Sequence, residues 1–214
     1  MTEMRTEEEQ IEAIKKWWEE NGKQTVAAAV VVLGGWFGYQ AYENNVQVTA
    51  EAASAVYQEV LSLSASEEES DKGQRAILLD QLKSEYSSTV YAQFASLFKA
   101  KDAVDAGDFA LAETELTAVV SNASDAALTH LATVRLARVM IAQEKFDDAL
   151  ALLNNDAVGA FEAEYLEAKG DALSAKGDLD AAREAYGKAM EAGLKIGANN
   201  PVLKMKLDNL AVAN

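Results

Sequence analysis

Three short stretches of the sequence follow one pattern and recur at a nearly constant spacing. Each contains a turn residue, then an aromatic residue or Leu that opens a helix, and an Ala three positions later; they cover residues 107–112, 144–149 and 177–182. The closing alanines lie 37 and 33 residues apart, a period typical of solenoids built from helix–turn–helix units. Such a chain buries its apolar side chains by stacking pairs of helices, so the repeat predicts the architecture of most of the sequence.

The composition agrees with a fold made of helices. The sequence contains a single proline, Pro201, and is rich in Ala, Leu, Glu and Lys, which are favourable in helices. No stretch alternates apolar and polar residues over the length that a half-buried strand needs. Four positions after each closing Ala comes a large side chain that can pack between paired helices: Leu116, Leu153 and Tyr186. We therefore predict an all-α fold.

The third repeat resembles the tetratricopeptide (TPR) pattern. The positions that match at the usual offsets are Gly170, Leu173, Gly177, Ala182, Tyr186 and Ala189. The first two repeats are degenerate, because Ala100 and Ala137 stand in place of the first Gly and Glu144 stands in place of the turn Gly. The resemblance implies a TPR-like helical-repeat domain, an α-solenoid.

Three repeats are close to the minimum for a solenoid core, so further helices must cover its ends. We expect these flanking helices over residues 49–63, 74–86 and 202–210. Between the first two lies a stretch rich in Ser and Glu, residues 62–73, which we predict to be a solvated loop.

Near the start of the chain, the stretch from Val26 to Tyr39 carries no charge and no strongly polar side chain. The uncharged segment between Lys23 and Glu43 is 19 residues long, which as a helix covers roughly 29 Å, close to the thickness of the hydrocarbon core of a bilayer. Three interpretations compete: a buried core helix, a cleaved secretory signal and a membrane anchor. A core helix would show a polar stripe at helical spacing, and none is present here.

The membrane anchor is the interpretation that we favour. Aromatic residues, which prefer the membrane–water interface, lie near both ends of the segment: Trp17, Trp18, Trp36, Tyr39 and Tyr42. A signal peptide would have a short basic region before a shorter apolar run, whereas this run follows a long arm with seven acidic residues. The small residues at 48–50 that could serve as a cleavage site lie well beyond the apolar run.

The distribution of basic residues predicts the orientation. Arg5, Lys15, Lys16 and Lys23 precede the apolar segment, and the next basic residue after it is Lys72. By the positive-inside rule the N-terminus is cytoplasmic and most of the chain lies across the membrane. We expect a cytoplasmic arm over residues 1–23, a transmembrane helix over 24–42 and a periplasmic TPR-like domain over 43–214.

Two features of the N-terminal part have more than one interpretation. The arm is predicted to be a short helix with Ile11, Ile14 and Trp18 on one face. This helix is expected either to lie on the inner leaflet or to bind a cytosolic partner. Gly34 and Gly38 form a GxxxG motif, which lets membrane helices approach closely, although glycine is common in such helices in any case.

Charge and residue types exclude several classes of function. From Val46 onward the chain has 15 Lys and Arg against 27 Asp and Glu, a net charge of −12, which is unfavourable for binding nucleic acid or anionic lipid. The sequence has no Cys and one His, His130, on a predicted helix, so a metal centre is not expected. No phosphate-binding Gly loop is present, and paired acids such as Asp147 and Asp148 are typical of a solvated face. We predict no catalysis and no cofactor.

A wider resemblance extends over nearly the whole chain. It is carried by the arm with residues 20–23, by the Gly-rich span, and by the stretches 133–139, 169–178 and 204–210. In this order they resemble the YfgM family of ancillary SecYEG translocon subunits of Gram-negative bacteria. The resemblance implies a single-pass protein of the inner membrane that partners the translocon and the membrane-anchored periplasmic chaperone PpiD. Its implied function is to help exported client proteins pass to periplasmic chaperones.

An alternative function is compatible with the same repeats. Another extracytoplasmic TPR scaffold, serving envelope assembly or cell division, would share the helical architecture but bind different proteins. The capture of translocon subunits rather than envelope-synthesis proteins would distinguish the two.

In TPR arrays the first helix of each pair lines the concave face. With the repeats aligned on their closing alanines, this face predicts a partner-binding groove formed by Phe94, Leu97, Lys101, Val104, Leu131, Val134, Arg138 and Ile141. The third repeat would add Glu164, Glu167 and Asp171. We expect an apolar groove with basic residues at one end and acidic residues at the other, or, alternatively, that several of its apolar residues pack against flanking helices.

Overall fold

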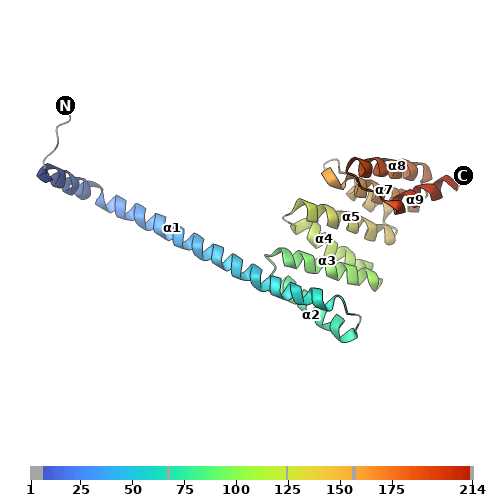
Figure 1. The fold of residues 1–214 in the computed structure, drawn as a ribbon, viewed down its shortest axis with the longest axis horizontal. Helices are drawn as coiled ribbons and strands as arrows, with labels where there is room; N and C mark the ends of the chain where they lie inside the picture. Colours follow the sequence, from blue (N-terminus) through green and yellow to red (C-terminus); the bar gives the residue numbers. More distant parts are fainter. Residues whose placement is uncertain (1–6, 67, 124, 156–157, 213–214) are drawn as a thin grey trace, which may run out of the picture. The chain divides into compact units, whose positions relative to one another are not determined.

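The structure is a computed structural model, and it describes residues 7–66, 68–123, 125–155 and 158–212. Throughout these residues every regular element is a helix (Figure 1), so the predicted all-α fold is confirmed. The chain divides into two compact units, Met1–Ala52 and Ala53–Asn214. The boundary falls within the first helix, α1 (Glu7–Leu63).

In the first unit, helix α1 contains both the predicted arm helix and the apolar segment without a break. Every side chain from Val26 to Val48 is exposed, so this segment is not a core helix of the chain. In the described part of the chain, α1 is the one helix that is long and apolar enough to cross a membrane.

The second unit begins with the last turns of α1, which pack against α2 (Glu69–Glu85) and α3 (Val90–Asp105). The flanking helix predicted to begin at residue 49 is therefore the end of α1. The loop prediction over 62–73 is wrong from Glu69 onward, where α2 already begins. Asp71 lies in the first turn of α2, where a carboxylate is favourable because of the helix dipole.

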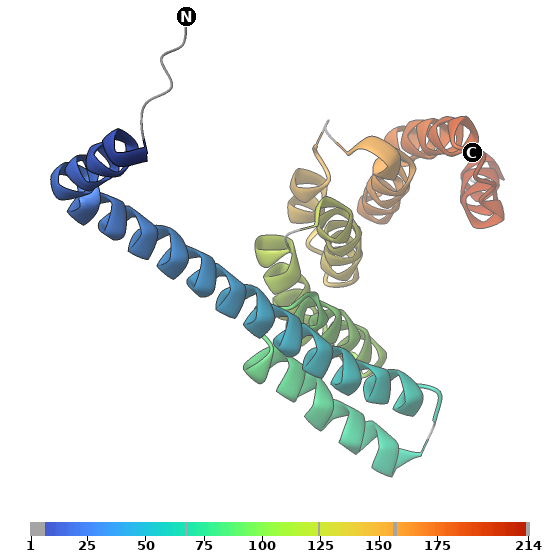
Figure 2. The ribbon, with the colours of Figure 1, turned by 60° about the vertical axis from the view of Figure 1, so that its left-hand side comes forward.

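The repeat region follows as helix pairs, and each pair contacts the next along the chain (Figures 1 and 2). After α3 come the remaining helices: α4 (Phe109–Asn122), α5 (Ala126–Ala142), α6 (Phe146–Leu152), the short 3-10 helix η1 (Gly159–Phe161), α7 (Glu162–Lys176), α8 (Leu179–Lys195) and α9 (Pro201–Val212). The three pairs are α3 with α4, α5 with α6, and α7 with α8. The second helix of the middle pair has only seven residues, half the length of α4.

The residues that define the repeat lie where the helices of a pair meet. Ala112, Ala149 and Ala182 are completely buried. The large residues four positions later, Leu116, Leu153 and Tyr186, are also buried. A small residue lets two helices approach closely, and the large one a turn later fills the adjacent space.

The turn that ends the first helix of each pair has the same geometry in all three repeats. Gly107, Glu144 and Gly177 have φ values of 77°, 60° and 93°. In each case the next residue donates its backbone N–H to a carbonyl five positions earlier, at 2.8 Å, 2.9 Å and 2.9 Å respectively. This is the Schellman end of a helix, which needs a left-handed residue and therefore favours Gly. Glu144 adopts that conformation in the degenerate second repeat although it has a Cβ.

Replacing Glu144 by Gly is therefore expected to stabilise the second unit. The left-handed conformation costs a residue with a Cβ about 1–2 kcal/mol, and the greater freedom of Gly in the unfolded chain takes back part of this gain. We expect a net increase of about 0.5–1 kcal/mol in the free energy of unfolding. Urea unfolding of a soluble fragment that starts at Val46 measures it. Gly177→Ala is the control and should destabilise; an unchanged or lower urea midpoint for Glu144→Gly would contradict the prediction.

Candidate binding groove

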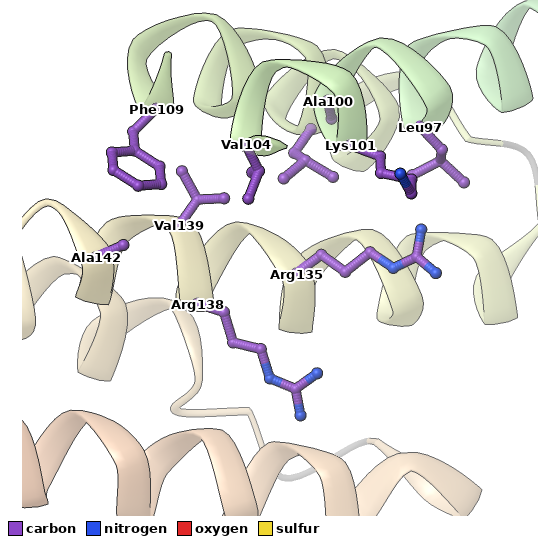
Figure 3. A pocket seen from close by; sticks show the side chains of 10 residues that line it. Leu97, Ala100, Lys101, Val104, Phe109, Arg135, Arg138, Val139 and Ala142 are labelled. Carbon is purple, nitrogen blue, oxygen red and sulfur yellow. The ribbon is translucent and has the colours of Figure 1, made fainter. Parts of the chain in front are cut away.

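A groove of about 310 Å³ opens between helices α3, α4 and α5 (Figure 3). Its apolar floor and walls include Leu97 and Val104 from α3, Phe109 from α4 and Val139 from α5. Leu97 and Val139 are buried, whereas Val104 is 39% exposed at the edge. The groove thus has a buried apolar base and an open apolar rim.

The helical period explains why these residues share one cavity. On α3, Leu97, Ala100 and Val104 are spaced by three and four positions, and so they occupy one face of the helix. On α5, Arg135, Val139 and Ala142 are spaced in the same way. Ala100 and Ala142 are too small to fill the space between the two helices, so a cavity remains there.

Three basic residues line the groove: Lys101 of α3 and Arg135 and Arg138 of α5. The Lys101 Nζ atom lies 2.6 Å from a carboxylate oxygen of Asp105, one turn further along α3. In Figure 3 the Arg135 side chain extends toward the Leu97 end of the groove, and Arg138 extends from α5 away from α3. Neither arginine has a hydrogen bond or ion pair within the described residues. Two guanidinium groups are therefore available to an external ligand.

The structure brings together four of the eight residues predicted for the binding groove. Leu97, Lys101, Val104 and Arg138 all line the cavity. Their presence at one cavity agrees with the geometry expected for a groove, and their role in binding stays a prediction.

The other four predicted residues do not line this cavity. Phe94 packs against Tyr57, with 5.5 Å between the ring centroids. Val134 is buried in the core formed by α5, α6 and α7, and Ile141 packs against that core. Leu131 is at the surface, 36% exposed. Packing against neighbouring helices, the alternative left open from the sequence, is thus what occupies Phe94, Val134 and Ile141.

Six residues that line the groove were not predicted to do so: Ala100, Phe109, Leu116, Arg135, Val139 and Ala142. For Arg135 the sequence does contain a signal. Arg135 precedes Arg138 by three positions, so the two lie on neighbouring faces of α5. Phe109 was recognised only as the residue that opens the second helix of its pair. Their positions at the cavity follow from the way α4 packs between α3 and α5.

The acidic end predicted for the groove is not open at two of its three residues. Glu164 is exposed, but Lys206 of α9 places its Nζ atom 2.7 Å from Glu167 and 2.7 Å from Asp171. Asn200 also donates a hydrogen bond of 2.9 Å to the Glu167 carboxylate. The C-terminal helix thus covers Glu167 and Asp171, and the acidic end of the groove stays a prediction.

This ion cluster shifts the pKa values of its members. Burial lowers the pKa of Lys206, but the hydrogen bonds to Asp171 and Glu167 outweigh burial and hold this pKa above its usual value of 10.5. Burial, together with a hydrogen bond of 2.7 Å to Asp171, raises the pKa of the Tyr186 hydroxyl. The ammonium group is thus favoured in the folded state.

Lys206→Met is expected to destabilise the second unit at neutral pH. The substitution leaves the buried Glu167 and the partly buried Asp171 without a cation. This costs several kcal/mol in a dry site and about 1–2 kcal/mol here, where Lys206 is partly exposed. Because the pKa of Lys206 is higher in the folded state, its contribution is fully present below pH 10.5 and is lost as the pH rises through that higher value.

Urea midpoints of the Val46 fragment at pH 7 and above pH 11 check this prediction. The difference in urea midpoint between the wild type and Lys206→Met should be smaller at the higher pH. Lys195→Met, which removes an exposed lysine with no ion pair in the described part of the chain, is the matched control. A Lys206→Met variant as stable as this control at pH 7 would show that the cluster is not stabilising.

His130 has a structural environment that its sequence context did not reveal. Its Nδ1 atom lies 3.0 Å from the Tyr165 hydroxyl, and its ring packs 5.2 Å from that of Phe161. These contacts join α5 to η1 and α7. No group of His, Cys, Asp and Glu that could hold a metal ion occurs in the described residues.

Comparison with known proteins identifies the family. The family model described as "Tetratricopeptide repeat-like domain" matches residues 15–212. The chain is 32% identical to a protein of Haemophilus influenzae over 95% of this chain and 97% of the relative. It is 29% identical to a protein of Neisseria gonorrhoeae over 95% of this chain and 97% of the relative. It is 30% identical to a protein of Escherichia coli over 96% of this chain and 97% of the relative.

Each of these three relatives carries the name "Ancillary SecYEG translocon subunit". That name describes a subunit of an assembly rather than an enzyme, and the absence of catalysis in this chain stays a prediction. No solved structure matches the chain. The similarity spans nearly the full length of both sequences and includes the apolar segment as well as the repeats. The chain therefore belongs to the YfgM family of ancillary SecYEG translocon subunits.

Proposed function

We propose that this protein is a membrane-anchored ancillary subunit of the SecYEG translocon. The observation that carries the proposal is the similarity over 95% or more of the chain to proteins with that name. A shared repeat domain alone would leave the partner open, since TPR-like domains bind many different proteins. Here the N-terminal helix and the repeat domain are matched together and in the same order.

The exposed apolar part of α1 supports the membrane anchor. A run of 19 uncharged residues, exposed over most of its length, is costly in water but matches the thickness of a bilayer. In this proposal residues 1–23 form the cytoplasmic arm, residues 24–42 cross the inner membrane and residues 43–214 form the periplasmic domain. The bias of basic residues toward the arm supports this orientation.

Protease accessibility tests the orientation. Protease added to intact spheroplasts is expected to digest the repeat domain, and the arm should be digested only after the membrane is lysed. Membranes washed with carbonate should retain the full-length protein. A repeat domain that is protected in intact spheroplasts would contradict the orientation, and release of the protein by carbonate would contradict the anchor.

The proposed work of the repeat domain is to pass exported proteins from the translocon to periplasmic chaperones, among them a PpiD-like membrane-anchored chaperone. An open apolar groove is suited to binding a segment of a protein that has not yet folded or that docks as a partner. The groove between α3, α4 and α5 supports this part of the proposal, together with the repeat architecture that presents it.

Affinity capture of the detergent-solubilised full-length protein tests the function. Translocon subunits and a PpiD-like chaperone should be enriched over a control in which residues 24–42 alone are replaced by an unrelated membrane-spanning sequence, so that the part of α1 that packs in the second unit is kept. Enrichment of envelope-assembly or cell-division proteins in place of translocon subunits would instead support the alternative scaffold function.

A further inference from the structure

We propose that the groove between α3, α4 and α5 selects segments in which carboxylate side chains flank bulky apolar ones. This inference deepens the proposed function and rests on its assignment of the groove as a binding surface. It names the chemistry of the segment that the groove accepts, which neither the repeat pattern nor the names of the relatives specify.

The apolar part of the preference follows from the floor of the groove. Leu97, Phe109 and Val139 surround a cavity of about 310 Å³, the size of a small ligand pocket. Val104, 39% exposed, extends this apolar surface to the edge. One or two bulky side chains of a bound segment would remove this surface from water, which favours binding.

The acidic part of the preference follows from the two free guanidinium groups. The second unit contains four arginines, and two of them bind carboxylates: Arg75 lies 2.8 Å from Asp102 and Arg183 lies 2.7 Å from Asp180. The other two, Arg135 and Arg138, both line the groove and have no partner within the described residues. In a chain of net charge −16, carboxylates are abundant. Within the described residues, the groove is thus lined by two arginine side chains that have no carboxylate partner.

Charge complementarity selects a protein segment over other anionic ligands. A nucleic acid or an anionic membrane surface would face the net charge of −12 that the chain carries from Val46 onward, and would be repelled. A short acidic segment meets mainly the local field of Arg135 and Arg138, since charges beyond about 8–10 Å are screened at physiological salt. Guanidinium groups also bind carboxylates in a bidentate geometry that a lysine does not offer.

Fluorescence anisotropy with the full-length protein in neutral-lipid nanodiscs tests the proposal. The probe is a fluorescein-labelled peptide, Glu-Glu-Leu-Phe-Glu-Glu, and the matched peptides carry Gln or Lys in place of Glu, or Ser in place of Leu and Phe. The Glu peptide should bind more tightly than all three. Each exposed ion pair is worth roughly two- to fivefold in affinity, so Arg135→Gln with Arg138→Gln should weaken binding of the Glu peptide about tenfold.

Matched variants separate the groove from the rest of the surface. Lys188→Gln with Lys195→Gln removes the same number of charges from α8 and should leave binding unchanged. Arg135→Lys with Arg138→Lys should restore part of the affinity. Val104→Asp removes apolar surface and places a carboxylate at the edge of the groove, so it should weaken binding of both peptides, and of the Glu peptide more than of the Gln peptide. Circular dichroism must show that each variant is folded.

Several results would overturn the inference. Equal affinity for the Glu and Gln peptides, or an equal loss in the α8 control, would show that the two arginines do not select the ligand. Self-association of the protein that is abolished by Arg135→Gln with Arg138→Gln would make a second copy of the chain the occupant. If the Glu peptide binds no more tightly than the matched peptides while the protein still captures translocon subunits, this inference alone is refuted. If the protein captures no translocon subunits while the Glu peptide still binds most tightly, the proposed function alone is refuted.

Discussion

Val134→Asp is expected to unfold the second unit, whereas Val104→Asp is expected to leave it folded. Both positions belong to the face that the repeats predict for the groove, but their surroundings differ. Val134 is 4% exposed within the core of α5, α6 and α7, and Val104 is 39% exposed. A buried carboxylate without a partner costs roughly 4 kcal/mol or more. At the exposed position we expect a cost below about 1 kcal/mol.

Urea unfolding followed by circular dichroism at 222 nm measures the two effects. The same substitution at both sites controls for the chemistry of Asp, so the difference reports on burial alone. A Val134→Asp variant with the wild-type midpoint would show that this part of the α5 face is open. Binding experiments on the groove should accordingly use Val104, Arg135 and Arg138, because loss of binding by a Val134 variant would report loss of the fold.

Gly170→Ala is expected to destabilise the α7–α8 pair strongly. A Cβ atom built at Gly170 lies 2.4 Å from Cδ1 and Cε1 of the Tyr186 ring, far inside van der Waals contact. Tyr186 is 3% exposed, and its hydroxyl is held by Asp171, so the ring has little room to move. Overpacking of this kind typically costs about 1–3 kcal/mol, and we expect a value near the upper end.

The other two repeats suggest the compensating change. The positions equivalent to Gly170 and Tyr186 are Ala100 and Leu116 in the first repeat, and both residues lie in one core cluster. Tyr186→Leu should therefore rescue much of the stability lost in Gly170→Ala, although it also removes the hydrogen bond to Asp171. A double-mutant cycle of urea midpoints measures the coupling. Additive effects of the two substitutions would contradict a direct steric contact.

The sequence was sufficient to predict the architecture because the repeat positions have a direct physical meaning. Ala112, Ala149 and Ala182 recur because only a small side chain fits where paired helices touch, and all three are completely buried. Two of the three left-handed turns could also be predicted from the sequence, since Gly occupies them. The left-handed conformation of Glu144 could not be predicted from its residue type, because a residue with a Cβ adopts it only when the surrounding fold holds it there.

The candidate site was only partly predictable, because helical periodicity gives the face of a helix but not what covers it. The sequence places both Val134 and Leu97 on the predicted concave face. In the structure Leu97 borders the open groove, whereas Val134 is buried in the core of α5, α6 and α7. Lys206 and Glu167 lie 39 residues apart, and their ion pair depends on where α9 packs. Neither periodicity nor charge could place that helix over the acidic residues of α7.

In-cell photocrosslinking tests the central claim most directly, namely that this protein associates with the translocon. A photoreactive amino acid is placed at single exposed positions: Phe37 in the apolar segment, Val104 and Arg138 at the groove, and Lys188 on α8. Irradiation of intact cells, followed by identification of the adducts by mass spectrometry, shows which proteins lie in contact. We predict that at least one position forms adducts with translocon subunits. Adducts with other membrane or envelope proteins alone, from positions that crosslink efficiently, would contradict the account.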